Sequence, residues 1–218
     1  MRNLIIFGDT PFAERVFKYI NFEGKDKVIA FTQEKNFISK KELQGLPVIP
    51  FEELDSFEES FEIVLGIGYT KMNKLKERIY DMCISNGYKI ATYISTNAIV
   101  YTNDIQEGCF IAPGSVVGPG CKIGKGNYLE SSVVLSHDNE LGDFNFLSTN
   151  TVLGGFSKVE SNCFLGLHST IKNDVTIASD NLFGSAVNVL TSVVNRGGVF
   201  VGNPARQLIG KESITTII

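Results

Sequence analysis

Apolar residues recur at every sixth position, without interruption, through the second half of this chain. At an apolar content of 43%, a run of this length has a chance of about one in a million per starting point. A period of six is neither the 3.6 of a helix nor the 8–12-residue spacing of a hairpin meander. The positions are Ile99, Ile105, Ile111, Val117, Ile123, Leu129, Leu135, Leu141, Leu147, Leu153, Val159, Leu165, Ile171, Ile177, Phe183 and Val189.

This spacing is typical of a coil of short parallel strands, in which the large residue fills the axis and a small one allows the backbone to turn a corner. We therefore predict one uninterrupted β-solenoid from about residue 95 to about residue 194, with three hexads per coil. A small or slim side chain stands two residues before each axis position. Cys109, Cys121 and Cys163 occupy this slot, and Cys83 lies on the apolar stripe of a predicted helix. All four are interpreted as packing residues rather than as disulfide partners or zinc ligands.

The first ninety residues follow a different pattern, in which short apolar strands alternate with amphipathic helices. This alternation predicts a small Rossmann-like parallel sheet, so the expected organisation is an α/β domain at residues 1–94 and a solenoid domain at residues 95–218. The predicted strands are Leu4–Phe7, Val28–Phe31, Leu46–Ile49, Ile63–Ile67 and Lys89–Ile94, and the predicted helices begin at Pro11, Phe51 and about Lys71, the last ending near Asn86.

Ligands of such sheets bind at the carboxyl ends of the strands. The loop after the first strand, Gly8–Ala13, has one glycine where a dinucleotide fingerprint has three. It is either a ligand loop or a capped turn in which Thr10 starts a helix, and the sequence leaves both readings open. The candidate substrate-binding residues at this edge are Gly8, Asp9, Thr10, Phe31, Thr32, Gly68, Tyr69 and Asn73.

Charge and hydropathy exclude several classes of partner. The net charge is −4 and no block of Lys or Arg is present, which argues against nucleic acid. No apolar run approaches the ~20 residues of a membrane span, and Leu4–Phe7 is too short for a signal peptide. A cytoplasmic location is expected.

Two histidines lie in the solenoid, and both fall off the axis phase. His137 stands among the acidic residues Asp138 and Glu140, which can orient an imidazole and raise its basicity. His168 has no carboxylate beside it in the sequence. His137 is therefore the candidate general base, and His168 is its rival.

The solenoid resembles the left-handed β-helix of hexapeptide-repeat acyltransferases. The whole chain resembles bacterial sugar O- and N-acyltransferases of the sialic-acid O-acetyltransferase type, which act on cell-surface sugars. The stretches that carry this resemblance are Ser136–Phe144, Cys163–Gly166 and Gly198–Arg206. The last contains Gly202-Asn203-Pro204-Ala205-Arg206, similar to the segment that ends the solenoid in this family and helps to hold coenzyme A.

The resemblance implies transfer of an acetyl group from acetyl-CoA to an amine or hydroxyl of a sugar, which is expected to be nucleotide-linked. It implies that His137 is the general base, that Asp138 orients it, and that acyl-CoA lies between the prisms of a homotrimer. Phe144, Phe146 and Phe156 lie off the axis phase and are expected to leave apolar surface for that assembly. The candidate acetyl-CoA-binding residues are Gly155, Gly166, His168, Gly184, Gly202, Asn203, Pro204, Ala205 and Arg206.

Other functions remain to be weighed. A non-catalytic trimeric scaffold, with the α/β domain as a sensor of small molecules, would need neither the His137-Asp138 pair nor the coenzyme A-type tail. A zinc carbonic-anhydrase-like solenoid would use three histidines, which two per chain do not readily supply, so no metal site is predicted. A covalent acyl-enzyme is not expected, because the chain has no G-x-S-x-G nucleophile elbow.

Overall fold

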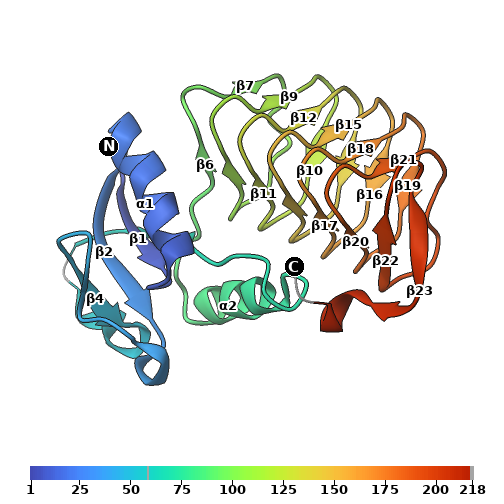
Figure 1. Cartoon of the computed structure of the whole chain (residues 1–218). Helices are drawn as coiled ribbons and strands as arrows, with labels where there is room; N and C mark the ends of the chain where they lie inside the picture. Colours follow the sequence, from blue (N-terminus) through green and yellow to red (C-terminus); the bar gives the residue numbers. More distant parts are fainter. Residues whose placement is uncertain (58, 217–218) are drawn as a thin grey trace.

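The computed structural model describes residues 1–57 and 59–216 and contains the two predicted parts, an α/β unit and a parallel β-helix (Figure 1). The α/β unit has a five-stranded sheet in the order β3-β4-β2-β1-β5, in which only β3 runs antiparallel to its neighbour. Its strands are β1 (Asn3–Phe7), β2 (Lys27–Gln33), β3 (Glu42–Leu43), β4 (Leu46–Pro50) and β5 (Glu62–Leu65). Its helices are α1 (Pro11–Glu23), α2 (Lys74–Ser85) and two 3-10 helices, Lys35–Phe37 and Phe51–Ser56.

The ends of the two α-helices follow from local backbone chemistry. Thr10 is the N-cap of α1 and Pro11 its first residue, as predicted, although the Thr10 hydroxyl makes no capping hydrogen bond. Gly24 ends α1 in the left-handed conformation. The second helix begins later than predicted, because Lys71–Asn73 have φ values of 50–61° and are not helical.

The predicted strand Lys89–Ile94 is divided between the two parts of the molecule. Ile90 bridges to Ile63 of β5, whereas Tyr93–Ile94 forms β6 and pairs with β8 of the β-helix. The segment Lys89–Ile94 therefore connects the α/β sheet directly to the first coil of the β-helix.

The β-helix has three faces, and most coils contribute a two-residue strand to each of them. The face that we name the aromatic face contains β6, β8 (Phe110–Ile111), β11 (Tyr128–Leu129), β14 (Phe146–Leu147), β17 (Phe164–Leu165), β20 (Leu182–Phe183) and β22 (Gly198–Val201), and β23 (Arg206–Glu212) closes it. The valine face contains β7 (Ile99–Val100), β9 (Val116–Val117), β12 (Val134–Leu135), β15 (Val152–Leu153), β18 (Thr170–Ile171) and β21 (Asn188–Val189). The charged face contains β10 (Lys122–Ile123), β13 (Glu140–Leu141), β16 (Lys158–Val159) and β19 (Thr176–Ile177). A third 3-10 helix, Ser213–Thr215, follows β23.

The register confirms three hexads per coil, because Leu129 pairs with Leu147 and Leu135 pairs with Leu153. From Ile111 to Val189 every predicted axis residue is buried. The prediction is wrong at the first position: Ile99 pairs with Val116, points outward and is 51% exposed, whereas Val100 takes the axis position. The first coil is one residue short, so the spacing of six enters the axis phase only at Ile105.

The small slots behave as predicted. Cys109, Cys121 and Cys163 are buried and free, and burial raises the pKa of the Cys109 and Cys163 thiols to about 12. Asparagine in this slot satisfies buried backbone groups: Asn127 Nδ2 donates to the Gly124 and Gly142 carbonyls, each at 2.7 Å, and Asn127 Oδ1 accepts from the backbone N–H one coil later. These side chains join successive coils at the corners.

The α/β unit covers the aromatic face. The rings of Phe110, Tyr128 and Phe146 stack in the outward positions, with centroids 4.8 and 5.2 Å apart and planes within 4° of parallel. Phe146 packs against Phe12 and Tyr69, and Phe144 packs against Tyr80 of α2. The expectation of exposed apolar surface at Phe144 and Phe146 is therefore wrong, because the chain's own α/β unit covers both.

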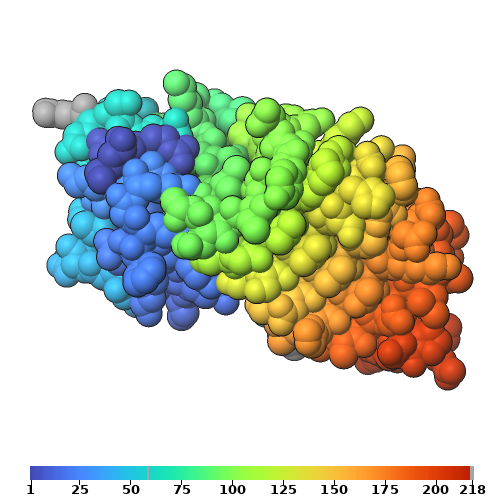
Figure 2. All heavy atoms as spheres, turned by 90° about the horizontal axis from the view of Figure 1, so that it is seen from above, coloured from blue at the N-terminus to red at the C-terminus, as the bar shows by residue number. Residues whose placement is uncertain are grey.

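The other two faces remain uncovered by the α/β unit. Phe156 is 54% exposed, at the corner between the valine and charged faces. Figure 2 views the molecule from above, the side on which β7, β9 and β12 lie in Figure 1, and shows the coils extending from the side of the α/β unit, with no part of α2 over this face. In the part of the chain that the structure describes, no helix is long and apolar enough to cross a membrane.

Candidate active site

The predicted base and its predicted partner lie together at the corner between the valine and charged faces. His137 Nδ1 is 2.9 Å from Asp138 Oδ2, and both side chains are 49% exposed. Asp138 has a φ of 51°, the left-handed conformation that recurs at this corner position in successive coils. The ring of Phe156 meets the imidazole edge-on, with centroids 5.0 Å apart. With Nδ1 bound to a carboxylate, Nε2 is the nitrogen free for proton transfer.

Gly155 lies one coil further along the same corner, directly beside the imidazole. A Cβ placed on Gly155 would lie 2.4 Å from His137 Nε2, which is far inside van der Waals contact. A side chain at this position would displace the ring or cover its reactive nitrogen. The corner thus combines a half-exposed imidazole, a carboxylate that orients it, and a glycine whose lack of a side chain lets the ring lie against the next coil.

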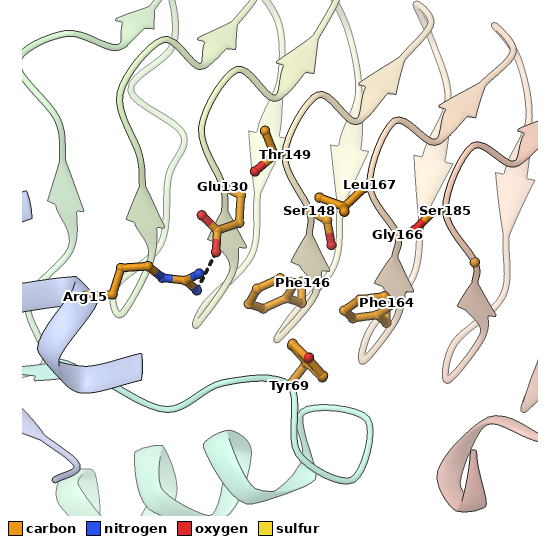
Figure 3. A pocket seen from close by; sticks show the side chains of 11 residues that line it. Arg15, Tyr69, Glu130, Phe146, Ser148, Thr149, Phe164, Gly166, Leu167 and Ser185 are labelled. Atoms are coloured by element: carbon orange, nitrogen blue, oxygen red, sulfur yellow. Dashed lines mark ion pairs between the residues drawn. The ribbon is translucent and has the colours of Figure 1, made fainter. Parts of the chain in front are cut away.

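A cleft of about 260 Å³ lies between the α/β unit and the aromatic face (Figure 3). It brings the predicted acceptor residue Tyr69 together with Gly166 and Gly184, which were predicted to bind acetyl-CoA. Tyr69, Phe146 and Phe164 give it an aromatic wall, and hydroxyl groups lie near its rim. The lining residues are Arg15, Tyr69, Glu130, Phe146, Ser148, Thr149, Phe164, Gly166, Leu167, Gly184 and Ser185.

The cleft contains two charged residues that the sequence reasoning missed. Arg15 of α1 lies 2.6 Å from Glu130 Oε1, and its guanidinium stands 4.7 Å from the centre of the Phe12 ring. Burial raises the pKa of Glu130, and the neighbouring arginine opposes that rise. The sequence held one signal, because Glu130 follows an axis leucine directly, in a slot that glycine often fills.

At the edge of the sheet, the structure closes much of the predicted acceptor loop. Asp9 is buried, and its Oδ2 accepts hydrogen bonds from the backbone N–H and hydroxyl of Ser39 at 2.6 and 2.7 Å. The Gly8 N–H donates to the Thr32 carbonyl, while Thr10 is exposed. Phe31 and Thr32 have no exposed surface, so the structure makes them core residues whose side chains have no surface to offer a ligand.

The loop before α2 contacts the β-helix. Gly68 lies against the Phe12 ring, and Tyr69 meets Phe146 and Phe164 edge-on. Asn73 is fully buried and its Nδ2 donates to the Cys163 carbonyl at 3.2 Å. Asn73 therefore joins the two parts of the chain rather than facing open solvent.

The remaining acetyl-CoA candidates fall at two places. Gly202–Ala205 forms the turn between β22 and β23, and Arg206 begins β23. The Ala205 N–H donates to the Asn188 carbonyl, Asn203 Oδ1 accepts from Asn188 Nδ2, and Pro204 and Arg206 are exposed. His168 is exposed with a φ of 61°, at the corner between the aromatic and valine faces. This is a different corner from that of His137, so one chain does not bring the two histidines together.

Solved structures share this fold over nearly the whole chain. Perosamine N-acetyltransferase from Caulobacter crescentus, in complex with CoA and GDP-perosamine, is 20% identical, with a TM-score of 0.84 over 95% of this chain and 97% of that one. The acetyltransferase domain of PglB from Neisseria gonorrhoeae, in complex with acetyl coenzyme A, is 21% identical, with a TM-score of 0.82 over 95% and 99%. WeeI from Acinetobacter baumannii is 21% identical, with a TM-score of 0.80 over 95% and 100%.

A family model describes the β-helix itself. Residues 93–201, from the first strand of the aromatic face to the end of β22, match the model of the GMPPB C-terminal domain. The match begins where the structure places the first coil. The chain belongs to the GMPPB C-terminal domain family.

Proposed function

We propose that this protein transfers an acetyl group from acetyl-CoA to an amine or hydroxyl of a nucleotide-linked sugar, as an enzyme of the sialic-acid O-acetyltransferase type. The observation that carries the proposal is the His137–Asp138 pair, whose imidazole lies against Gly155 of the next coil. The fold shared with acetyltransferases bound to CoA, acetyl-CoA and GDP-perosamine supports it. We assign acceptor binding to residues 1–94, and acetyl transfer to residues 95–218 with the Gly202–Arg206 turn as the coenzyme A-binding tail.

In the reaction, His137 Nε2 takes the proton from the acceptor as its nitrogen or oxygen attacks the thioester carbonyl. Asp138 holds the Nδ1 proton and stabilises the imidazolium that forms. A backbone N–H of the corner holds the tetrahedral oxyanion. The carbon–sulfur bond then breaks, and the coenzyme A sulfur leaves with the proton from His137. The cysteines take no part, because all are buried.

The assembly that we propose is a homotrimer built on the valine face. Val134 and Val152 point outward there and are half-buried, which leaves a contiguous apolar strip on a face that the α/β unit does not cover. The charged face instead carries the ion pair of Lys158 and Glu140. Packing three valine faces around an axis brings the His137 corner of one chain against the opposite corner of the next.

Such a trimer also completes the site. In a three-fold assembly each coil keeps its height, so His137 lies level with the coil that carries Glu130, at the end of the next chain's cleft. Acetyl-CoA would run from His137 past Gly155 towards Arg206, between two prisms. The sugar would enter from the cleft of the neighbouring chain.

The experiment is thiol release from acetyl-CoA across a panel of amino sugars and nucleotide-linked amino sugars. His137→Ala should lower the turnover number by about 10²–10⁴, the range for loss of a positioned proton acceptor. Asp138→Asn should lower it less, because only the orientation and basicity of the imidazole change. His168→Ala tests the rival histidine at the other corner. Loss of activity in His168→Ala with full activity in His137→Ala would reverse the assignment, and full activity in both would end the enzyme proposal.

A further inference from the structure

Phe156 has a backbone conformation that bulky residues rarely adopt. It occupies the turning position at the corner between the valine and charged faces, where the chain has φ values in the left-handed region. The same position in neighbouring coils is filled by Gly120, Asp138 and Asp174, with φ values of 72°, 51° and 59°. Glycine and aspartate tolerate this region well, whereas phenylalanine, with a φ of 60°, adopts it at a cost. Residues held in such conformations concentrate at functional sites.

Packing does not explain the phenylalanine at this corner. Phe156 is 54% exposed and lies outside the apolar cluster that fills the axis of the β-helix. Phe144 has the same left-handed backbone at the corner between the charged and aromatic faces, but it is 1% exposed because Tyr80 of α2 covers it. The ring of Phe144 is therefore part of a buried core, whereas the ring of Phe156 is not.

The backbone of the corner directs the Phe156 ring towards His137. At this corner a side chain leans back over the preceding coil, since the Asp138 carboxylate occupies the space that a Cβ on Gly120 would need. Phe156 stands at the Asp138 position of the next coil, and its ring meets the imidazole of His137 edge-on, with planes at 90°. Aromatic pairs favour this T-shaped arrangement.

The imidazole of His137 needs such a contact, because its other support is exposed to water. The hydrogen bond from Nδ1 to Asp138 joins two side chains that are both 49% exposed, and polar pairs at the surface fix geometry only weakly. Gly155 lets the ring lie against the next coil but offers no side chain to hold it. The Phe156 ring is the side chain of the next coil that stands against the imidazole.

We propose that Phe156 is a positioning residue for His137, whose imidazole it holds in the rotamer that keeps Nδ1 at Asp138 and presents Nε2 to the acceptor. The inference rests on the proposed function and adds one residue to its machinery. Phe156 acts through His137 and takes no proton itself. Loss of its ring should therefore lower the fraction of molecules with a correctly placed base, and not the affinity for acetyl-CoA.

The first measurement is the rate of thiol release from acetyl-CoA by the full-length protein. Phe156→Asn removes the ring with a residue that suits the left-handed backbone, so the corner should stay folded. Its turnover number should fall about 2–10-fold, the range for loss of one aromatic pair, with an unchanged KM for acetyl-CoA. Phe156→Tyr keeps the ring and should retain the wild-type turnover number. Phe22→Asn is the control, because Phe22 is a 90% exposed phenylalanine on α1, and it should match the wild type.

The second measurement is independent of activity. The chain has two histidines, so the imidazole C–H region of a carbon-13 NMR spectrum of histidine-labelled protein should show two sets of signals, assigned with His168→Ala. In Phe156→Asn the signals of His137 should move, because the neighbouring ring is gone, and those of His168 should stay in place.

Three results would overturn the inference. They are an unchanged turnover number or unchanged His137 signals in Phe156→Asn, a raised KM for acetyl-CoA with an unchanged turnover number, which would make the ring a donor contact, and a change of assembly state in light scattering, which would make it an interface residue. Each of these results leaves the proposed function intact. A wild type that releases no thiol would end the proposed function, and the His137 signals would then decide the inference alone.

Discussion

Lys76 is a lysine of α2 that is buried where α2 packs against the β-helix, and its burial lowers the stability of the protein at neutral pH. It is 1% exposed, and its Nζ has no hydrogen-bond partner among the described residues. The rings of Tyr128 and Phe146 lie 5.8 and 5.6 Å from Nζ. Burial lowers the pKa of this lysine from 10.5 to about 7. We predict that Lys76→Met, which keeps a long apolar side chain in the same space, stabilises the protein at neutral pH.

The magnitude follows from the two pKa values. In the unfolded chain the lysine is protonated up to pH 10.5, whereas in the folded protein it loses its proton at about pH 7. The free energy of unfolding therefore rises as the pH increases from about 7 to 10.5. Acidification reverses this gain, and below about pH 7 the contribution of this lysine no longer changes. At about 1.4 kcal/mol per unit, the gap of about 3.5 units costs about 5 kcal/mol at pH 7. A cation–π attraction of about 1–2 kcal/mol offsets part of this cost while the amine is protonated.

The assay is urea unfolding at one protein concentration, at pH 7.0 and pH 9.5. The free energy of unfolding of the wild type should rise by about 3 kcal/mol from pH 7.0 to pH 9.5 because of this group. The Lys76→Met protein should lack this rise and should be more stable than the wild type at pH 7. Lys122→Met, on the exposed charged face, is the control and should follow the wild type. A Lys76→Met protein that is less stable at pH 7, with the pH dependence of the wild type, would refute the reasoning.

Two further predictions concern acetyl-CoA binding and assembly. Arg206→Ala should raise the KM for acetyl-CoA about tenfold or more without lowering the turnover number, as loss of a contact to a coenzyme A phosphate requires; an unchanged KM would remove the phosphate role. Val152→Lys places a charge on the valine face and should convert the proposed trimer to monomers in light scattering, with an unchanged circular dichroism spectrum. A Val152→Lys protein that remains trimeric would move the interface to another face.

The sequence predicted most of the β-helix because its repeat is strict. One residue in six must be large and one small for a coil to close, so Leu135 and Cys121 could be placed without a structure. The position of a residue within the six-residue repeat predicts whether its side chain points inward or outward, but not which other part of the chain covers it. Phe146 points outward as expected, and only the fold reveals that Phe12 and Tyr69 bury it.

The geometry of the candidate site was predictable where its members are neighbours in the sequence. His137 and Asp138 are adjacent, and the left-handed backbone of the corner lets their side chains meet. Arg15 and Glu130 stand far apart in the chain and meet only because α1 docks on the aromatic face. Phe31 and Thr32 were misplaced for a related reason. The end of a parallel strand can face a ligand or the domain core, and here the Phe31 ring packs against Phe17 while the Thr32 hydroxyl donates to the Ile49 carbonyl of β4.

The three faces differ in the residue type at the one outward-pointing strand position of each hexad. This residue type determines what each face contacts. Aromatic residues there bind the α/β unit and so form the cleft, whereas Lys158 and Glu140 keep the third face in water. The remaining face carries valine, and it lies between the two corners that hold His137 and His168. In the proposed reaction, acetyl-CoA binds at the His137 corner of one chain and the sugar binds in the cleft of the next chain. The two substrates can meet only if these parts of the two chains lie close together. In the proposed trimer, valine at the outward position draws these corners together, so substitutions on this face should impair the proposed acetyl transfer without touching His137.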